Sequence, residues 1–307
     1  MRVIFMGTPA FALPSLARMR ARGDEIVAVV TQPDRPRGRG QSLSPSPVKA
    51  AALAAGLPVV QPEKVRHADF LAWCRTVSPD LIVVVAFGQI LPQALLDIPR
   101  RGCLNVHASL LPRYRGAAPI QWAIIRGETE TGVTTMQIDA GMDTGPMLLQ
   151  RRLAIAPDET AGELAERLSH LGAEVLVDTL EALEAGRLQP IPQEGALATL
   201  APLLKKDDGR IDWKQPAPVL AALVRGTDPW PGAYTLHRDR PLRIRRARAE
   251  AGAGEPGAII RAEAGGIAVG TGAGLLIITE VQVSGGARLS AGDAVSGRLV
   301  LAGERVI

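Results

Sequence analysis

Asn105, His107 and Asp143 are the residues of this chain whose types and spacing are best suited to chemistry. One apolar residue separates Asn105 from His107 at the end of a strand-like run, so both side chains project from the same face of the strand. An amide and an imidazole placed together can donate hydrogen bonds to a carbonyl oxygen, the amide as a neutral donor and the imidazole as a titratable one. Asp143 adds a carboxylate from a loop between two further strand-like runs.

Each of these three residues also has an ordinary structural role. An Asn at a strand end forms turns, a His beside apolar residues is commonly a hydrogen-bonded core residue, and an Asp between glycines can close an Asx turn. The combination favours a function, because two polar groups on one face of a hydrophobic strand are costly to bury without a purpose.

Short apolar runs and helical segments alternate in the first half of the chain. Strands are predicted at 2–6, 25–31, 81–86 and 104–106, and helices at 10–22 and 48–55. Val- and Ile-rich runs of this length are typical of parallel strands buried on both faces, so the alternation predicts a doubly wound α/β sheet. The turn that follows the first strand resembles a nucleotide-binding turn, but Pro9 and Ala12 break the G-x-G-x-x-G pattern and disfavour a dinucleotide site.

A long helix, a linker and a β-rich domain are predicted for the rest of the chain. The apolar spacing predicts a helix over 160–185, with Gly186 just past its end. Residues 189–201 contain two prolines without periodicity and are interpreted as a linker. A helix is expected at 217–225, and strands at 234–237, 242–248, 257–261, 267–270, 275–281 and 297–301. Short strands separated by Gly-rich turns predict a small β-barrel.

The composition indicates a globular protein with a sizeable core, since 47% of the 307 residues are hydrophobic. Cys74 and Cys103 lie beside apolar stretches and are expected to be free, buried thiols, and no Cys/His cluster has zinc spacing. The N-terminus enters a strand at once, and the longest apolar run, 81–87, is too short to span a bilayer. We therefore expect a cytoplasmic protein.

The net charge of +4 is modest but unevenly distributed. Residues 34–49 carry four cationic residues against one acid, and residues 238–248 carry six arginines against one aspartate. Each patch alone is compatible with a solvated surface, but two basic patches in different domains favour a polyanionic partner. Residues 32–47 are also rich in Pro, Gly and Ser and are too long for an ordinary strand-to-helix connection, which indicates a loop that grips a substrate.

Several motifs together resemble the methionyl-tRNA formyltransferase family, over nearly the whole chain. Asn-Val-His-Ala-Ser-Leu-Leu-Pro at 105–112, with Asp143 in Asp-Ala-Gly-Met-Asp-Thr-Gly, resembles the core of enzymes that use 10-formyltetrahydrofolate. The basic segment 32–49 and Arg-Gly-Ala-Ala-Pro-Ile-Gln at 115–121 resemble the tRNA branch. Ile-Asp-Trp at 211–213 and Pro-Trp-Pro-Gly at 229–232 also resemble this branch, but they occur in amino-sugar formyltransferases as well.

The resemblance implies transfer of a formyl group from 10-formyltetrahydrofolate to the α-amino group of methionyl-initiator tRNA. It implies a Rossmann-like catalytic domain at 1–188, a linker at 189–206 and an OB-like β-barrel that binds tRNA at 207–307. Asn105 and His107 would donate hydrogen bonds to the oxyanion of the reaction, and Asp143 would orient His107 and help to move the amine proton through water.

The resemblance also assigns binding residues. The implied folate-binding residues are Phe87, Gly88, Gln89, Ile90, Leu91, Ser109, Leu110, Leu111, Pro112, Asp139 and Gly141. The implied tRNA-binding residues are Arg35, Arg37, Arg39, Lys49, Lys205 and Lys206. No metal and no membrane partner are expected, and the chain is expected to act as a monomer.

Two other functions remain open at this point. Formylation of an amino-sugar nucleotide would need no large basic loop, so a tRNA-binding assay separates it from formylation of tRNA. A catalytically inactive, RNA-binding relative would not need Asn105, His107 and Asp143, and their joint presence argues against it.

Overall fold

The computed structural model describes residues 1–37, 42–283 and 285–307, which form two compact units. The first unit contains Met1–Gly116, Thr131–Leu153 and Ala165–Leu200, and the second contains Ala117–Glu130, Ala154–Leu164 and Ala201–Ile307. Two segments from the middle of the chain thus join the C-terminal unit. Domain boundaries at 188 and 206 remain a prediction.

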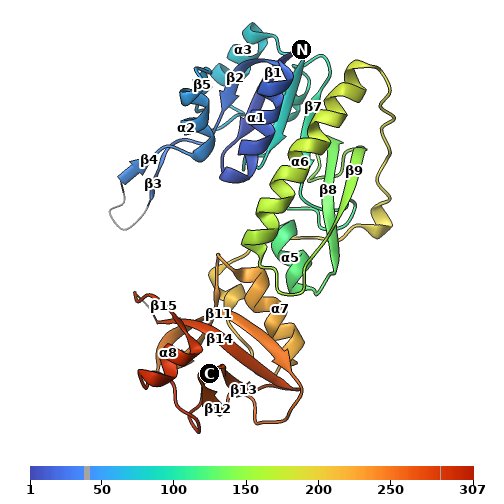
Figure 1. The fold of residues 1–307 in the computed structure, drawn as a ribbon. Helices are drawn as coiled ribbons and strands as arrows, with labels where there is room; N and C mark the ends of the chain where they lie inside the picture. Colours follow the sequence, from blue (N-terminus) through green and yellow to red (C-terminus); the bar gives the residue numbers. More distant parts are fainter. Residues whose placement is uncertain (38–41, 284) are drawn as a thin grey trace. The chain divides into compact units, whose positions relative to one another are not determined.

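A seven-stranded sheet forms the centre of the first unit, in the order β5-β2-β1-β6-β7-β8-β9 (Figure 1). Its strands are β1 Arg2–Gly7, β2 Glu25–Val30, β5 Val59–Val60, β6 Leu81–Val85, β7 Cys103–His107, β8 Glu130–Gln137 and β9 Met147–Ala154. The pairs from β5 to β7 are parallel, and β7 pairs with β8 in antiparallel fashion. All five residues of β6 are buried, as the unbroken apolar run predicts. The predicted Rossmann-like α/β architecture is confirmed.

Helices flank this sheet. They are α1 Leu13–Arg22, which follows a 3-10 turn at Ala10–Ala12, α2 Pro47–Ala54, α3 Ala68–Val77, α4 Gln93–Leu96 and α6 Ala161–Glu184. The short helix α5 Pro119–Ile125 belongs to the second unit. A Cβ added to Gly172 of α6 would lie 3.0 Å from Cγ1 of Val106, so α6 packs closely on the face of β7 that carries Val106. Because side chains alternate along a strand, Asn105 and His107 project from the opposite face of β7.

The basic insert begins and ends in two short strands, β3 Arg35–Arg37 and β4 Ser42–Ser44, which pair antiparallel. Figure 1 shows this hairpin extending away from the main sheet. The chain then enters α2, whose first turn is capped because the Ser46 hydroxyl accepts a hydrogen bond from the Lys49 backbone amide at 3.1 Å. The composition of the insert predicts a loop, and the strands β3 and β4 are an addition that the sequence does not indicate.

The second unit contains a six-stranded antiparallel sheet in the order β10-β11-β14-β13-β12, with β15 paired to β14. Its elements are β10 Ala233–His237, β11 Arg240–Glu250, β12 Ile259–Glu263, β13 Gly266–Gly270, β14 Leu275–Val283, β15 Arg288–Ser290, α7 Ala217–Thr227, α8 Ala291–Ser296 and a 3-10 turn at Lys206–Gly209. The last residues contact both edge strands, since Ile307 exchanges backbone hydrogen bonds with Leu236 and Glu304 accepts one from Ile259. The strand order remains an open path, so an OB-like barrel stays a prediction.

The predicted strand at Gly297–Leu301 is wrong. These residues follow α8, and the amides of Gly297 and Leu299 donate to the carbonyls of Asp293 and Ala294 in the manner of a helix end. Val300 is buried in the core of the second unit. The apolar character of this segment therefore reflects its burial in the core, although the segment does not pair as a strand. The short strand β15 and helix α8 were not predicted.

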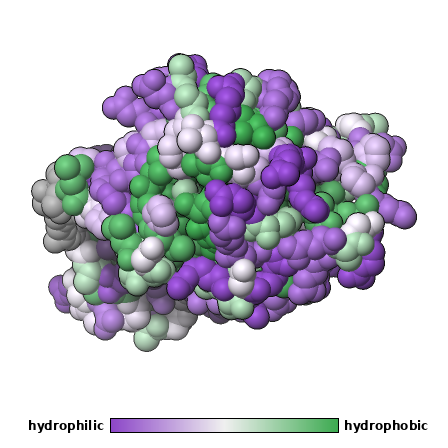
Figure 2. Space-filling view, turned by 90° about the horizontal axis from the view of Figure 1, so that it is seen from above, coloured by the Kyte–Doolittle hydropathy of each residue, from purple (hydrophilic) through white to green (hydrophobic). Residues whose placement is uncertain are grey.

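The surface and the thiols give little sign of a site. Figure 2 shows hydrophobic residues gathered in places between hydrophilic ones on the visible face. Cys74 and Cys103 are free and buried, as predicted, and burial raises the pKa of both thiols to about 12.

None of the helices in the described ranges combines the length and apolarity needed to cross a membrane.

Candidate active site

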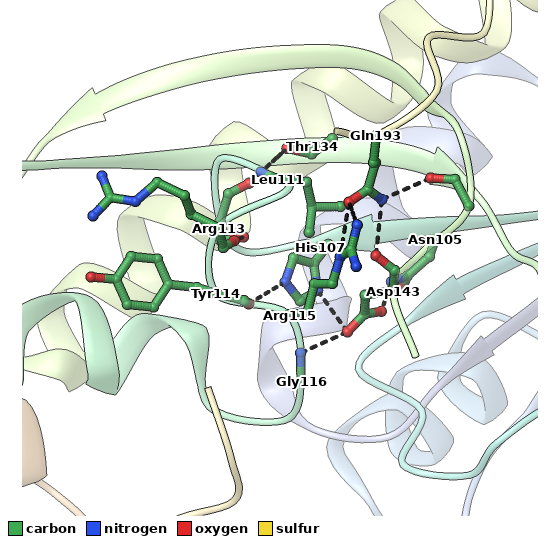
Figure 3. Close-up of polar contacts among 12 residues, drawn as sticks. Asn105, His107, Leu111, Arg113, Tyr114, Arg115, Gly116, Thr134, Asp143 and Gln193 are labelled. Atoms are coloured by element: carbon green, nitrogen blue, oxygen red, sulfur yellow. Dashed lines mark hydrogen bonds and ion pairs between the residues drawn. The ribbon is translucent and has the colours of Figure 1, made fainter. Parts of the chain in front are cut away.

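The three candidate catalytic residues meet at the carboxyl end of β7 (Figure 3). Asn105 and His107 lie on β7, and Asp143 lies in the loop between β8 and β9. The Asp143 carboxylate accepts a hydrogen bond from the Gly116 amide at 2.9 Å and from Asn105 Nδ2 at 3.5 Å, and its Oδ2 lies 3.6 Å from His107 Nδ1. The structure therefore brings together an amide, an imidazole and a carboxylate that are up to 38 residues apart in sequence.

The His107 ring is held by a backbone carbonyl. Its Nε2 lies 2.9 Å from the carbonyl oxygen of Tyr114, and because a carbonyl only accepts, Nε2 carries a proton. Nδ1 then faces the Asp143 carboxylate, and protonation of Nδ1 makes it a donor in that direction. The Nδ1–Oδ2 separation exceeds a good hydrogen bond, so this donor is available to a third group.

The β8–β9 loop that carries Asp143 depends on close backbone approaches. A Cβ on Gly145 would lie 2.0 Å from the carbonyl oxygen of Gln137, so only glycine lets the chain return to the sheet here. Asp139 closes the other side of the loop, because its Oδ1 accepts from the Gly141 amide and the Thr144 hydroxyl. Asp143 itself has φ +54°, a left-handed conformation that Asp tolerates better than most residues.

The residues predicted to bind folate fall into exposed and buried groups. Ile90 is 86% exposed beside Gly88 in the loop after β6, whereas Phe87 is buried. The Gln89 side chain is occupied by the segment before α3, since it accepts from the Val65 amide and donates to the Glu63 carbonyl.

The second predicted folate wall, Ser109–Pro112, is mostly turned into the protein. Ser109 is fully buried, and its hydroxyl donates to the Arg113 carbonyl at 2.7 Å. Leu111 is also buried, and its amide donates to the Thr134 hydroxyl. Leu110 and Pro112 are half-buried, so they are the members of this wall that retain accessible surface. Their part in binding remains a prediction.

Comparison with known proteins identifies the family of this chain. The family described as "Formyl transferase" matches residues 1–180, and "Formyl transferase, C-terminal domain" matches residues 203–299. A methionyl-tRNA formyltransferase of Geobacter metallireducens is 56% identical over 295 residues, covering 96% of this chain and 95% of the relative. That of Geobacter sulfurreducens is 53% identical over 306 residues, covering 100% and 96%. The chain belongs to the formyl transferase family, in the branch of methionyl-tRNA formyltransferases. The resemblance inferred from the motifs is confirmed.

Solved structures share the fold of this formyl transferase at low identity. The sugar 3N-formyltransferase WlaRD, solved with dTDP and 5-N-formyl-THF, superimposes with a TM-score of 0.70 at 17% identity, covering 94% of this chain and 99% of WlaRD. HypX from Aquifex aeolicus, solved in complex with tetrahydrofolic acid, has a TM-score of 0.66 at 19% identity, covering 96% of this chain and 46% of HypX. Both of these neighbours were thus solved with a tetrahydrofolate derivative. The described residues of this chain hold no group of three His, Cys, Asp or Glu side chains suited to a metal ion.

The basic insert of this formyl transferase is anchored at its base by an ion pair. Lys49 Nζ lies 2.5 Å from Asp34 Oδ2 and 2.7 Å from Gln61 Oε1, and Gln61 Nε2 donates to Asp34 Oδ1 at 2.9 Å. The hydrogen bond from Lys49, followed by that from Gln61, lowers the pKa of Asp34. Lys49 therefore has a structural partner in addition to its predicted role with tRNA.

Two of the three arginines of the insert, Arg35 and Arg37, lie on β3. Arg35 is exposed on β3, and Arg37 continues that strand opposite Ser42. Arg39 lies outside the described residues. Binding of tRNA by these arginines remains a prediction.

The second unit places its basic residues beside acids. Arg238 contacts Glu304, Arg245 contacts Asp228 at 3.0 Å, and Arg246 contacts Glu163 at 2.6 Å. Lys205 and Lys206 are exposed but precede Asp207 and Asp208, and the Asp208 carboxylate accepts from the Lys205 amide. Much of the local positive charge counted from the sequence is thus neutralised within the unit.

Sequence reasoning missed two residues that hold the site together. Tyr114 supplies the carbonyl that fixes His107, and Gln193 donates through Nε2 to the carbonyls of Asp143 and Gly145. Gln193 lies in the segment interpreted as a linker. No local pattern marks a glutamine whose partners lie about 50 residues earlier, so only the folded chain shows this contact.

Proposed function

We propose that this chain transfers the formyl group of 10-formyltetrahydrofolate to the α-amino group of methionyl-initiator tRNA. One observation carries the proposal: a chain that matches methionyl-tRNA formyltransferases over nearly its full length has Asn105, His107 and Asp143 gathered at one strand end. The product is formylmethionyl-tRNA, which serves in translation initiation.

The oxyanion donors follow from the contacts of the cluster. A neutral amine attacks the formyl carbon, which places negative charge on the formyl oxygen. Asn105 Nδ2 and protonated His107 Nδ1 stand at 3.5 Å and 3.6 Å from the Asp143 carboxylate, at the outer limit for hydrogen bonds. Neither donor atom is held by a strong existing partner, so both can donate to a substrate oxygen while the Tyr114 carbonyl still holds the His107 ring, as oxyanion stabilisation requires.

The carboxylate of Asp143 is suited to proton transfer. Formation of the new C–N bond and cleavage of the bond from the formyl carbon to folate N10 require one proton to leave the amine and one to reach N10. Asp143 faces His107 and is 19% exposed at its side chain, so it is reachable from solvent and can accept the amine proton through water. The Gly116 amide keeps this carboxylate in place during the exchange.

Exposed apolar groups support a folate slot beside the cluster. Ile90 in the loop after β6 is 86% exposed, and Met142 in the loop before β9 is 60% exposed. The pterin would lie against residues 87–91 and 139–143, held by backbone polar groups that the fixed turns present. The Gln89 side chain would contribute little to recognition of the pterin, since it already bonds the Val65 amide and the Glu63 carbonyl.

Charge supports tRNA as the acceptor. Phosphate contacts supply most of the affinity of a protein for nucleic acid, and arginine matches phosphate geometry. The insert exposes Arg35 on the strand β3, which also contains Arg37, and the base of the insert is anchored by Lys49 and Asp34. We propose that this insert and the exposed Lys205 and Lys206 contact the tRNA, and that the chain acts as a monomer in the cytoplasm.

An acceptor competition tests the proposal. Purified protein is given 10-formyltetrahydrofolate together with methionyl-tRNA or a nucleotide-linked amino sugar, and the formylated product is identified by mass spectrometry. We expect formylmethionyl-tRNA with the wild-type chain and almost none with His107→Ala. Formylation of the amino sugar alone, or donor turnover with neither acceptor formylated, would contradict the proposal.

A further inference from the structure

The segment 191–199, here called the return segment, crosses the active-site loops of the first unit. Ile191 exchanges two backbone hydrogen bonds of 2.8 Å with Met147 at the start of β9. Thr199 accepts from the Tyr114 amide through its hydroxyl and from the Arg115 amide through its carbonyl. The return segment thus contacts both the Asp143 loop and the turn that holds His107.

Gln193 makes the most specific of these contacts. Its Nε2 donates to the carbonyl oxygens of Asp143 at 2.9 Å and Gly145 at 2.7 Å, and its Oε1 accepts from Arg115 Nε at 3.0 Å and Nη2 at 2.7 Å (Figure 3). A carboxamide is the only neutral side chain that offers two donors and an acceptor in this arrangement. A carboxylate of the same shape would place an anion against two carbonyl oxygens.

These bonds close a ring around Asp143. The backbone carbonyl of Asp143 is bound by Gln193, Gln193 is bound by Arg115, and the next residue, Gly116, donates its amide to the Asp143 carboxylate. Both ends of Asp143 are therefore tied to the same short turn. Since Asp143 sits at φ +54°, a less favoured conformation, contacts at both ends are what hold it there.

We propose that Gln193 is a positioning residue that keeps the Asp143 carboxylate directed at His107. The inference rests on the proposed function and extends it to a residue outside the recognised motifs. The return segment is mostly exposed and contributes little to the core, so loss of the Gln193 side chain removes orientation without removing the fold. A misplacement of about 1 Å in a catalytic group can lower turnover by about a hundredfold.

Turnover tests the proposal first. Gln193→Ala should lower kcat by roughly ten- to hundredfold, with the KM values for both substrates within about twofold. Gln193→Glu should be at least as impaired, because it repels the two carbonyls. Glu194→Ala is the matched control. Glu194 is exposed, and its backbone carbonyl, which the substitution keeps, accepts a hydrogen bond from the Leu197 amide, so kcat should not change.

A double-mutant cycle separates positioning from a general structural effect. In an Asp143→Asn background, Gln193→Ala should cost less than about twofold in kcat, because the carboxylate that it orients is already gone. A full additional loss in that background would show that Gln193 acts apart from Asp143, and would overturn the proposal. So would wild-type kcat in a folded Gln193→Ala variant.

Amide hydrogen exchange provides a readout that does not depend on the acceptor. Gln193→Ala should raise exchange in the peptide that spans 139–147, with a melting temperature within about 3 °C of wild type, whereas Glu194→Ala should leave exchange unchanged. Unchanged exchange in Gln193→Ala would overturn the proposal even if the enzyme were active. If the wild-type chain failed to formylate methionyl-tRNA while exchange responded as expected, the proposed function alone would fail.

Discussion

The catalytic cluster and the basic insert lie in the same unit and hold their functional groups in different ways. His107 and Asp143 are 6% and 19% exposed at their side chains, and each has partners on two sides. Arg35 in the insert is exposed, and the described anchoring lies at the base of the hairpin, where Lys49 contacts Asp34. This difference is consistent with the proposed roles, chemistry for the cluster and capture of the substrate for the insert. Changes in the cluster should appear in kcat, and changes in the insert should appear in KM.

The largest effect is expected at the oxyanion donors. His107→Ala or Asn105→Ala should lower kcat by roughly two to three orders of magnitude, because each removes a donor to the developing oxyanion. Formyl transfer at saturating substrates, beside a thermal melt, measures the effect in folded protein. Near-normal turnover in a folded variant would remove the assigned roles.

A somewhat smaller loss is expected at the carboxylate. Asp143→Asn keeps the shape and the Gly116 contact but removes the charge, so kcat should fall by about a hundredfold through loss of proton transfer. Folate binding, followed by fluorescence titration, should change little, because in the proposed slot the pterin is held by backbone groups. A variant with wild-type kcat would reduce Asp143 to a loop former.

The insert should respond through tRNA affinity. Arg35→Ala should raise the KM for methionyl-tRNA by roughly three- to tenfold and reduce the salt slope of binding by about one, as for one lost phosphate contact. Arg35→Lys should restore part of the affinity, since lysine keeps the charge but loses the planar fork. Arg39→Ala is expected to behave in the same way on the basis of the sequence. An unchanged tRNA dependence for both variants would favour the amino-sugar substrate.

The smallest effect is expected at the paired arginines of the second unit. The hydrogen bond from Arg246, followed by those from Thr160, lowers the pKa of Glu163 to about 2. This pair therefore stabilises the fold above the ordinary carboxyl pKa of 4.5 and is lost as the pH falls towards 2. Arg246→Ala should lower the melting temperature slightly at pH 6 but not at pH 2, with no change in the KM for tRNA. A clear rise in that KM would place Arg246 with the insert arginines.

The elements that carry the cluster could be predicted because their signals are local. The apolar run of β6, the alternation of Asn105 and His107, and the helical spacing that ends at Gly186 each follow from neighbouring residues. Burial on both faces of a parallel sheet leaves a continuous hydrophobic pattern that is readable without tertiary information.

The missed features depend on contacts between distant residues. Pro190 and Pro192 interrupt any periodicity, so the sequence predicts a linker around Gln193, yet the partners of Gln193 are the backbone carbonyls of Asp143 and Gly145. The net charge of residues 238–248 likewise leaves out Asp228 and Glu163, which lie elsewhere in the sequence and pair with Arg245 and Arg246 in the folded chain. Sequence patterns locate the reactive groups, whereas the groups that orient or neutralise them emerge only on folding.

Single-turnover formylation of methionyl-tRNA by His107→Ala and Arg35→Ala, over a range of enzyme concentrations, tests the division between cluster and insert most directly. We expect Arg35→Ala to reach the wild-type rate once the enzyme saturates the tRNA. His107→Ala should remain roughly a hundredfold or more slower at every concentration. An Arg35→Ala rate that stays low at saturation, or a His107→Ala rate that recovers, would contradict the account.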